Sequence, residues 1–307
     1  MSHLYDVTAL GNPVFDYIET PYVKTDWRVP SGCSFNAALT IGKLGGKVSA
    51  VGRVGEDFLD KLMQKANQYG VSVYPIISKE SGGFYLKYLD QKMDRRELRL
   101  LGDAGKIRFE EIPGEALGAE CYIVGPILGE VDLEIIKRLK EVNPDSLIMV
   151  DPQGLVRRVN SGVVSRVRTV DSIHTIRYSE LYKPNEHEAA VIFPDLNPVE
   201  ASKAIVKLGC RVGIVTVAER GSFVSFEDKT YHVPAFRTME RDPTGCGDVY
   251  IGAYTTWYLS SRDPLESAIF ASAAASFMVE SVGPDFKIEY DLVMERFESL
   301  VEGVERL

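Results

Sequence analysis

The stretch Asp242-Pro243-Thr244-Gly245-Cys246-Gly247-Asp248 joins a glycine-containing turn to an apolar segment of helical length, residues 249–259. The first backbone N–H groups of a helix have no partner within the helix, and the helix dipole favours negative charge there. Gly245 and Gly247 have no side chain to keep a phosphate away from the backbone, and both can adopt positive φ. The stretch therefore predicts an anion site at a helix N-terminus.

Asp248 places an acid at this predicted anion site. A carboxylate repels a bound phosphate, so its position fits a base that takes a proton from a hydroxyl as that hydroxyl attacks phosphorus. Aspartate is also common at helix starts, where its side chain caps free amides. From this stretch alone, both roles remain open.

The composition is that of a globular protein with a sizeable core. The chain has 307 residues, of which 45% are hydrophobic and 26% charged. Its net charge of -9 argues against nucleic acid or an anionic membrane as a partner, because both attract basic proteins. The chain shows no transmembrane segment and no signal-peptide pattern, so we expect a cytoplasmic protein. The four cysteines form no Cys-x-x-Cys pair and predict neither a zinc site nor a disulfide framework.

Strand and helix patterns alternate regularly from Cys121 onward, which favours a largely parallel sheet covered by helices on both faces. Two acids follow predicted strands, where ligands bind in such sheets. Asp16 comes shortly after a strand at 5–10, and Asp151 directly follows one at 147–150. Position alone does not decide whether these acids contact a ligand or belong to ordinary loops.

The segment 242–248 resembles the C-terminal signature of the ribokinase (PfkB-type) carbohydrate kinase family, which runs Asp-x-Thr-Gly-Ala/Cys-Gly-Asp. This motif is more specific than a lone glycine-rich loop. The resemblance implies that Asp248 is the catalytic base. It also implies that Gly245, Cys246 and Gly247 form the anion hole.

The N-terminal region is similar to the other signature of this family. The spacing from Gly11 to Asp16 and the stretch 30–38 carry this similarity. It implies that Asp16 and Asn36 hydrogen-bond the substrate and that Gly32 lets the substrate approach the backbone.

Three residues of this stretch, Ser31, Cys33 and Ser34, depart from the family pattern. Cys33 stands where ribokinases have a lysine, which puts ribose in doubt as the substrate. The stretch also fits a helix start capped by Ser31 or Ser34, and that alternative is compatible with substrate binding.

The resemblance also implies two cation sites. Asn185 and Glu188 resemble the Asn-x-x-Glu motif of the family, which places Mg2+ through its waters. The same spacing fits a capping box at a helix start, and both roles are compatible. In the family, the backbone near Asp242 and Thr244 holds a monovalent cation, which implies K+ as a further cofactor.

The nucleotide site implied by the resemblance includes two segments. Thr216 and Gly221 match a loop that lies close to the nucleotide in the family, although Ala218 replaces its middle glycine. Gly245 and Gly247 contribute from the anion hole. The expected phosphate donor is ATP.

The resemblance implies a ribokinase-like α/β fold, in which a mostly parallel sheet is flanked by helices in three layers and carries a small β-sheet lid. We expect the catalytic core at 1–13, 32–80 and 105–307, and the lid at 14–31 and 81–104.

Aromatic residues on the lid strands, such as Phe84 and Tyr88, need cover from solvent. This predicts a homodimer formed through the lids. The alternative is that these residues pack only on their own core.

The predicted protein is an ATP-dependent kinase that phosphorylates a hydroxyl of a small polyhydroxy substrate, namely a sugar, sugar acid or polyol. A nucleoside is the main alternative substrate. From another class, the chain would be a catalytically idle sugar-binding regulator, but such a protein has no need of Asp248. A dinucleotide-dependent oxidoreductase is disfavoured, because the first strand is not followed by Gly-x-Gly-x-x-Gly.

Overall fold

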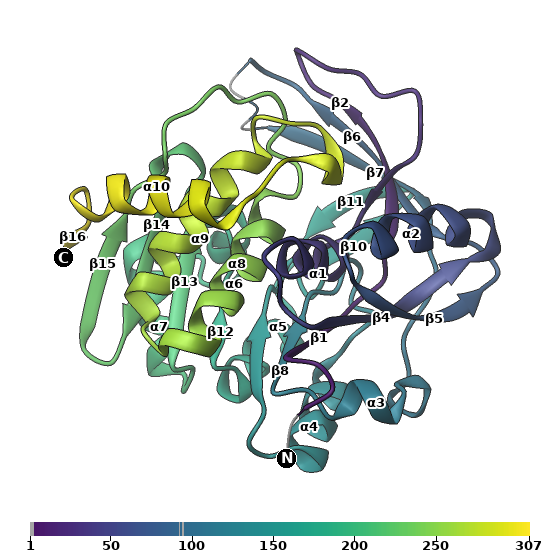
Figure 1. Ribbon diagram of the computed structural model, residues 1–307, viewed down its shortest axis with the longest axis horizontal. Coiled ribbons are helices and arrows are strands. Elements are labelled where there is room, and N and C mark those ends of the chain that lie inside the picture. Colours follow the sequence, from purple (N-terminus) through teal and green to yellow (C-terminus); the bar gives the residue numbers. More distant parts are fainter. Residues whose placement is uncertain (1–2, 92, 94) are drawn as a thin grey trace.

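The computed structural model describes residues 3–91, 93 and 95–307 and contains two sheets (Figure 1). The larger sheet has ten strands, and neighbouring strands from β13 to β5 pair in parallel. The three strands at the other edge are antiparallel. In spatial order the strands are β16 (Glu305–Arg306), β15 (Lys229–Val233), β14 (Ser222–Phe226), β13 (Val212–Thr216), β12 (Leu181–Tyr182), β9 (Leu147–Val150), β8 (Cys121–Val124), β1 (Val7–Leu10), β4 (Val48–Gly55) and β5 (Ser72–Ser78).

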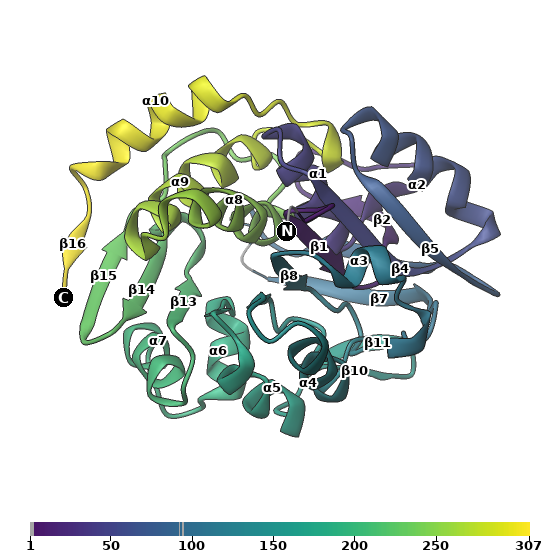
Figure 2. The same ribbon diagram turned by 60° about the horizontal axis from the view of Figure 1, so that its bottom comes forward.

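Helices cover both faces of this sheet (Figure 2). One face carries α1 (Cys33–Lys43), α2 (Glu56–Gln68), α8 (Cys246–Ser261), α9 (Pro264–Met278) and α10 (Tyr290–Val301). The opposite face carries α3 (Gly114–Leu117), α4 (Leu133–Val142), α5 (Val170–His174), α6 (Glu186–Ile192) and α7 (Pro198–Lys207). Short 3-10 helices are η1 (Phe109–Glu111), η2 (Ile176–Tyr178), η3 (Ala218–Arg220) and η4 (Gly283–Asp285). Within the described ranges, no helix combines the length and apolarity needed to cross a bilayer.

The three layers follow from side-chain alternation along the strands. In β8, Cys121 and Ile123 belong to the core under α8 and α9, whereas Tyr122 and Val124 belong to the core under α4 and α7. Both faces of the strand are therefore apolar, as expected for a parallel sheet between two helical layers. The three-layer arrangement expected from sequence is confirmed.

The smaller sheet lies beside the carboxyl ends of the parallel strands and has six strands. Its order is β10 (Arg157–Asn160), β11 (Val163–Arg166), β7 (Arg96–Gly102), β6 (Gly82–Tyr88), β2 (Val14–Glu19) and β3 (Val29–Ser31). Four of these strands fall within the segments expected to form a lid. The hairpin at 157–166 joins the same sheet through the pairing of Val163 with Arg99, although sequence placed it in the core. That this sheet acts as a separate lid stays a prediction.

Phe84 and Tyr88 are buried within the single chain. Phe84 packs in a cluster with Val14 and Leu86, and the Tyr88 hydroxyl lies 3.0 Å from Thr244 Oγ1. Their burial agrees with the alternative that they pack on their own core. A homodimer through the smaller sheet stays a prediction, to be measured by sedimentation, and it no longer has this argument in its favour.

Candidate active site

A cleft of about 1370 Å³ lies between the smaller sheet and the carboxyl ends of the parallel strands. Asp151 after β9, Lys183 after β12 and Thr216 at the end of β13 line it from the large sheet. Asp16 on β2 lines it from the smaller sheet, so this acid lies in a strand and not in a loop. The position matches the edge at which open α/β sheets bind their ligands.

The glycine turn before α8 forms one wall of this cleft. Gly245 is the N-cap residue and has a φ of 85°, a left-handed conformation that glycine adopts without strain. Among the described residues, the backbone amides of Gly245 and Gly247 have no hydrogen-bond acceptor. The Cys246 amide is used within the turn, where it donates to the Pro243 carbonyl at 3.2 Å. The turn therefore offers two free amides to an anion, and a contribution from Cys246 stays a prediction.

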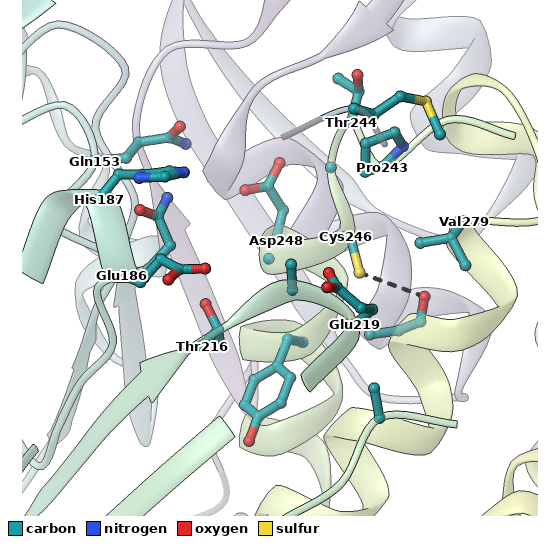
Figure 3. A pocket seen from close by; sticks show the side chains of 18 of the residues that line it. Gln153, Glu186, His187, Thr216, Glu219, Pro243, Thr244, Cys246, Asp248 and Val279 are labelled. Atoms are coloured by element: carbon teal, nitrogen blue, oxygen red, sulfur yellow. Dashed lines mark hydrogen bonds between the residues drawn. The ribbon is translucent and has the colours of Figure 1, made fainter. Parts of the chain in front are cut away.

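Asp248 projects from the first turn of α8 into the cleft (Figure 3). Its Oδ2 accepts a hydrogen bond of 2.9 Å from Asn36 Nδ2, which fixes the carboxylate. Burial raises the pKa of Asp248, and the nearby charge of Asp151 raises it further. The hydrogen bond from Asn36 opposes this rise. A carboxylate with a raised pKa is a stronger base, which suits proton abstraction.

A buried ion pair between Lys183 and Asp151 lies next to this carboxylate. Lys183 Nζ is 2.7 Å from Asp151 Oδ2, and the two side chains are 2% and 5% exposed. Although burial lowers the pKa of Lys183, the charge of Asp151 raises it above its usual value, so the lysine stays charged. A Cβ built on Gly247 would lie 3.4 Å from Lys183 Nζ, which places the cation beside the free amides.

No motif in the sequence points to Lys183. The only local signal is its position at the end of a short apolar strand, directly before Pro184. Its burial against Asp151 depends on the pairing of β12 with β9.

Asp16 and Gly32 line the cleft, but Asn36 does not. Asp16 is 4% exposed, and burial raises its pKa to about 7, against the opposing effects of Ser31, Arg157 and Arg96. Asn36 donates to Asp248 instead, so its expected substrate contact stays a prediction. Gly32, with a φ of 117°, is the N-cap residue of α1.

The alternative cap by serine at the start of α1 is wrong. No side chain caps this helix. Ser34 Oγ donates to the Gly11 carbonyl at 2.8 Å, and Ser31 Oγ lies 3.5 Å from Asn36 Nδ2.

Asn185 and Glu188 form the capping box of α6. Asn185 Oδ1 accepts from the Glu188 amide at 3.0 Å, and Glu188 Oε2 accepts from the Asn185 amide at 2.9 Å. Both residues line the cleft, and Glu188 is 3% exposed. Burial, followed by the charge of Asp151, raises the pKa of Glu188. Their oxygen atoms suit Mg2+ contacted through water, and this metal role stays a prediction.

Thr216 and Gly221 line the cleft on the side away from the smaller sheet. The Thr216 amide donates to the Pro184 carbonyl at 3.1 Å. Gly221 has a φ of 92°, and a Cβ there would lie only 2.0 Å from the Val233 carbonyl oxygen. The cleft lining also includes the apolar residues Pro234, Ala275, Val279 and Leu307, together with polar ones such as Ser272 and Ser276.

Asp242 and Thr244 lie behind the glycine turn. Asp242 is fully buried, and its Oδ1 accepts from the Thr244 amide at 3.0 Å. Its Oδ2 has no hydrogen-bond partner among the described residues. Burial raises the pKa of Asp242 to about 6, although the hydrogen bonds from Thr244 oppose this. An unpartnered, buried carboxylate oxygen suits a cation.

Comparison with known families identifies this arrangement. The model of the pfkB family carbohydrate kinase matches residues 6–290. The chain belongs to this family. As a PfkB-family kinase, it is a phosphotransferase that acts on an alcohol group, as expected from sequence. The regulator and oxidoreductase alternatives are not supported.

Two relatives of this PfkB-family kinase cover most of its length. A cytidine kinase of Thermococcus kodakarensis is 26% identical and covers 87% of the chain and 92% of the relative. A deoxyribokinase of Salmonella typhi is 24% identical and covers 91% of the chain and 94% of the relative.

A solved pyrophosphate-dependent kinase of the ribokinase family has a TM-score of 0.79 at 20% identity. The match covers 91% of the present chain and 96% of the solved one. Ribokinase from Thermotoga maritima has a TM-score of 0.77 at 19% identity, with coverages of 96% and 99%. These structures confirm the ribokinase-like fold.

Proposed function

We propose that this protein is an ATP-dependent kinase that phosphorylates a hydroxyl of a small polyhydroxy substrate, with Asp248 as the base. One observation carries the proposal. The Asp248 carboxylate is held by Asn36 beside two free backbone amides, in a cleft that it shares with Asp16. The substrate class comprises sugars, sugar acids and polyols.

In the proposed reaction, Asp16 and the backbone at Gly32 hold the acceptor. Asp248 takes the proton of the reacting hydroxyl. The hydroxyl oxygen of the acceptor then forms a bond to the γ-phosphorus of ATP. The bond from this phosphorus to the bridging oxygen breaks, and ADP leaves with that electron pair. The free amides at Gly245 and Gly247 stabilise the negative charge that develops on the phosphoryl oxygens.

Lys183 adds a fixed positive charge at the same place, because its ammonium lies beside Gly247. The ion pair with Asp151 holds the ammonium in position. Asn36 keeps the base oriented through its hydrogen bond to Asp248. These three side chains therefore position or support the reacting groups.

Two cation sites belong to this proposal. Asn185 and Glu188 would hold Mg2+ through water, and the ion supplies charge neutralisation at the donor phosphates when it is bound. Asp242 and Thr244 would hold K+, supported by the unpartnered Oδ2 of Asp242.

ATP is the proposed donor because the cleft lining includes, besides Thr216 and Gly221, apolar residues such as Ala275 and Val279 that suit an adenine. A ribokinase-like protein from E. coli, with a TM-score of 0.74, has been solved with ATP and Mg2+. The similarity to a pyrophosphate-dependent kinase makes pyrophosphate the alternative donor. Two assays distinguish the donors: ADP release when ATP is supplied, and phosphate release when pyrophosphate is supplied.

A nucleoside is the second candidate acceptor. The cytidine kinase relative supports it, as does a nucleoside kinase of Methanocaldococcus jannaschii that is 22% identical over 95% of the chain. Cytidine and the other common nucleosides therefore belong in the same acceptor panel as the sugars, sugar acids and polyols.

The test of the proposal is Asp248→Asn, assayed for ADP release with Mg-ATP and the best acceptor of the panel. The amide keeps the shape of the side chain but cannot accept the proton. We expect kcat to fall by about 100-fold or more, while calorimetry shows unchanged ATP binding. Asp263→Asn, at the exposed N-cap of α9, is the control and should leave kcat unchanged. Near-normal turnover by Asp248→Asn would refute its role as the base.

A further inference from the structure

Three arginines of the smaller sheet line the cleft on the side of Asp16. Arg96 lies on β7, Arg157 begins β10, and Arg166 ends β11. Arg96 and Leu98 are two residues apart on the strand, so their side chains lie on the same face, and both line the cleft. The phosphoryl transfer proposed above assigns no role to these three arginines.

Arg157 and Arg166 are direct partners in the antiparallel pairing of β10 with β11. Side chains that lie opposite each other on such strands are close together, and like charges in this position are destabilising. Both nevertheless line the cleft. The repulsion would be relieved by an anion bound between the two guanidinium groups.

Among the described residues, none of these three guanidinium groups forms an ion pair. Arg157 is 8% exposed, and within the described ranges it donates only to neutral oxygens, the Ile127 carbonyl at 3.3 Å and Gln153 Oε1 at 2.5 Å. Its guanidinium also lies 5.7 Å from the centroid of the Phe84 ring. Arg96 reaches the Tyr88 hydroxyl at 3.5 Å. Burial, followed by the charge of Arg96, lowers the pKa of Arg157 to about 10, so the group remains charged near neutral pH. A buried cation without a counter-ion is costly, which indicates a place for an anionic ligand.

The nearby acids do not supply this counter-ion. Glu188 and Asp248 attract Arg157 through space, but Glu188 is held in the capping box of α6 and Asp248 by Asn36. Asp16 also lies close enough for Arg157 and Arg96 to lower its pKa against burial, but it forms no ion pair with them. Arg96 likewise lowers the pKa of the buried Asp242, and again the described residues show no ion pair between the two. The arginines therefore stand on the acceptor side of the cleft.

We propose, on the basis of the kinase function above, that the acceptor carries an anionic group, a carboxylate or a phosphate, bound by Arg157, Arg166 and Arg96. Planar guanidinium groups can bind either group through two parallel hydrogen bonds. The preferred acceptor is then a sugar acid or a sugar phosphate, and a neutral sugar, polyol or nucleoside lacks this contact.

The first experiment compares matched acceptors that differ in charge. Gluconate and 2-keto-3-deoxygluconate are set against sorbitol for the carboxylate, and ribose 1-phosphate is set against ribose for the phosphate. We expect at least one charged member to exceed its neutral partner in kcat/KM by about 10- to 100-fold, as typical of a charge-assisted contact. Whichever pair shows this preference identifies the anionic group. A preference for the neutral member in both pairs would overturn the proposal.

The second experiment uses Arg157→Gln and Arg166→Gln, with Arg99→Gln as the matched control. Arg99 lies on β7, but it is exposed and pairs with Glu97 on the side away from the cleft. We expect the first two variants to raise KM for the charged acceptor about tenfold or more, with little change in KM for Mg-ATP and none in the control. Because Arg166 is exposed, its variant tests the site even if Arg157→Gln folds poorly. A rise confined to KM for Mg-ATP would mean that the arginines serve the donor, and the proposal would fall.

Calorimetric titration of the charged acceptors into the protein without donor separates this inference from the proposed function. Binding that Arg157→Gln and Arg166→Gln weaken, together with no turnover, would support the anion site and refute the kinase mechanism. Turnover of neutral acceptors without arginine-dependent binding of charged ones would refute the anion site alone.

Discussion

Asp248 differs from an ordinary capping aspartate in what surrounds its carboxylate. It lies inside the first turn of α8, and no side chain caps this helix. It accepts a hydrogen bond from Asn36, which is 212 residues away in the chain. Burial and the charge of Asp151 raise its pKa, which supports its proposed role as the base. The capping alternative is wrong, because the side chain forms no cap hydrogen bond.

Asp242 is the residue on which we base a prediction about K+. Because its buried Oδ2 has no partner among the described residues, we expect K+ to bind there and order the glycine turn. The rate of ADP formation should rise severalfold when K+ replaces Li+ at equal ionic strength. In Asp242→Asn this stimulation should disappear, since the amide is neutral. Equal rates in both salts for the wild-type protein would contradict the K+ site.

The turn between β13 and β14 shows how one element tolerates an unusual residue. Ala218 begins η3 with a φ of 51°, a left-handed conformation that disfavours a Cβ. It stands at the middle glycine of the loop pattern that the family resemblance implies. Ala218 lines the cleft, on the side that we propose binds the donor.

Ala218→Gly should therefore stabilise the protein. Relief of the left-handed strain outweighs the extra backbone entropy of glycine, so we expect the free energy of unfolding to increase by about 0.5–1 kcal/mol. Chemical denaturation measures this change. The matched control is Ala204→Gly within α7, which should lower stability by about 1 kcal/mol because glycine disfavours a helix. A loss of stability in both variants would show that Ala218 is not strained.

The whole molecule forms the cleft by placing the smaller sheet against the larger one, and this arrangement buries ionisable side chains. Asp16 lies at this junction, and burial raises its pKa to about 7. An aspartate in the unfolded chain has a pKa of about 3.9. The folded state therefore holds the proton more tightly, and this contribution to stability is present below about pH 4 and is lost as the pH rises to about 7.

We expect Asp16→Asn to raise the melting temperature more at pH 8 than at pH 5, because the amide removes a charge that the folded state buries. Thermal unfolding followed by circular dichroism checks this. Asp26→Asn, at an exposed position between β2 and β3, is the control and should show no such dependence on pH. An equal shift for Asp16→Asn at both pH values would mean that its carboxyl is not perturbed by burial.

Features that rest on local patterns could be predicted from the amino-acid sequence alone. The glycine turn with its following apolar segment predicted the helix start at Gly245, and the alternation of strands and helices predicted the layered sheet. Spacing at Asn185 and Glu188 predicted their capping box, because its two hydrogen bonds lie within one helical turn. These features depend on residues close together in the chain.

Contacts between residues that are distant in the chain became apparent from the packed structure, because no local pattern encodes them. Strand order and sheet packing produce three such contacts: the hydrogen bond from Asn36 to Asp248, the burial of Lys183 against Asp151, and the cluster of three arginines. The hairpin at 157–166 is largely polar, so its sequence carries no apolar alternation that would assign it to the smaller sheet. The pKa values and the ion pairs in the cleft depend on burial. Because burial is a property of the packed chain, the sequence pattern alone does not give them.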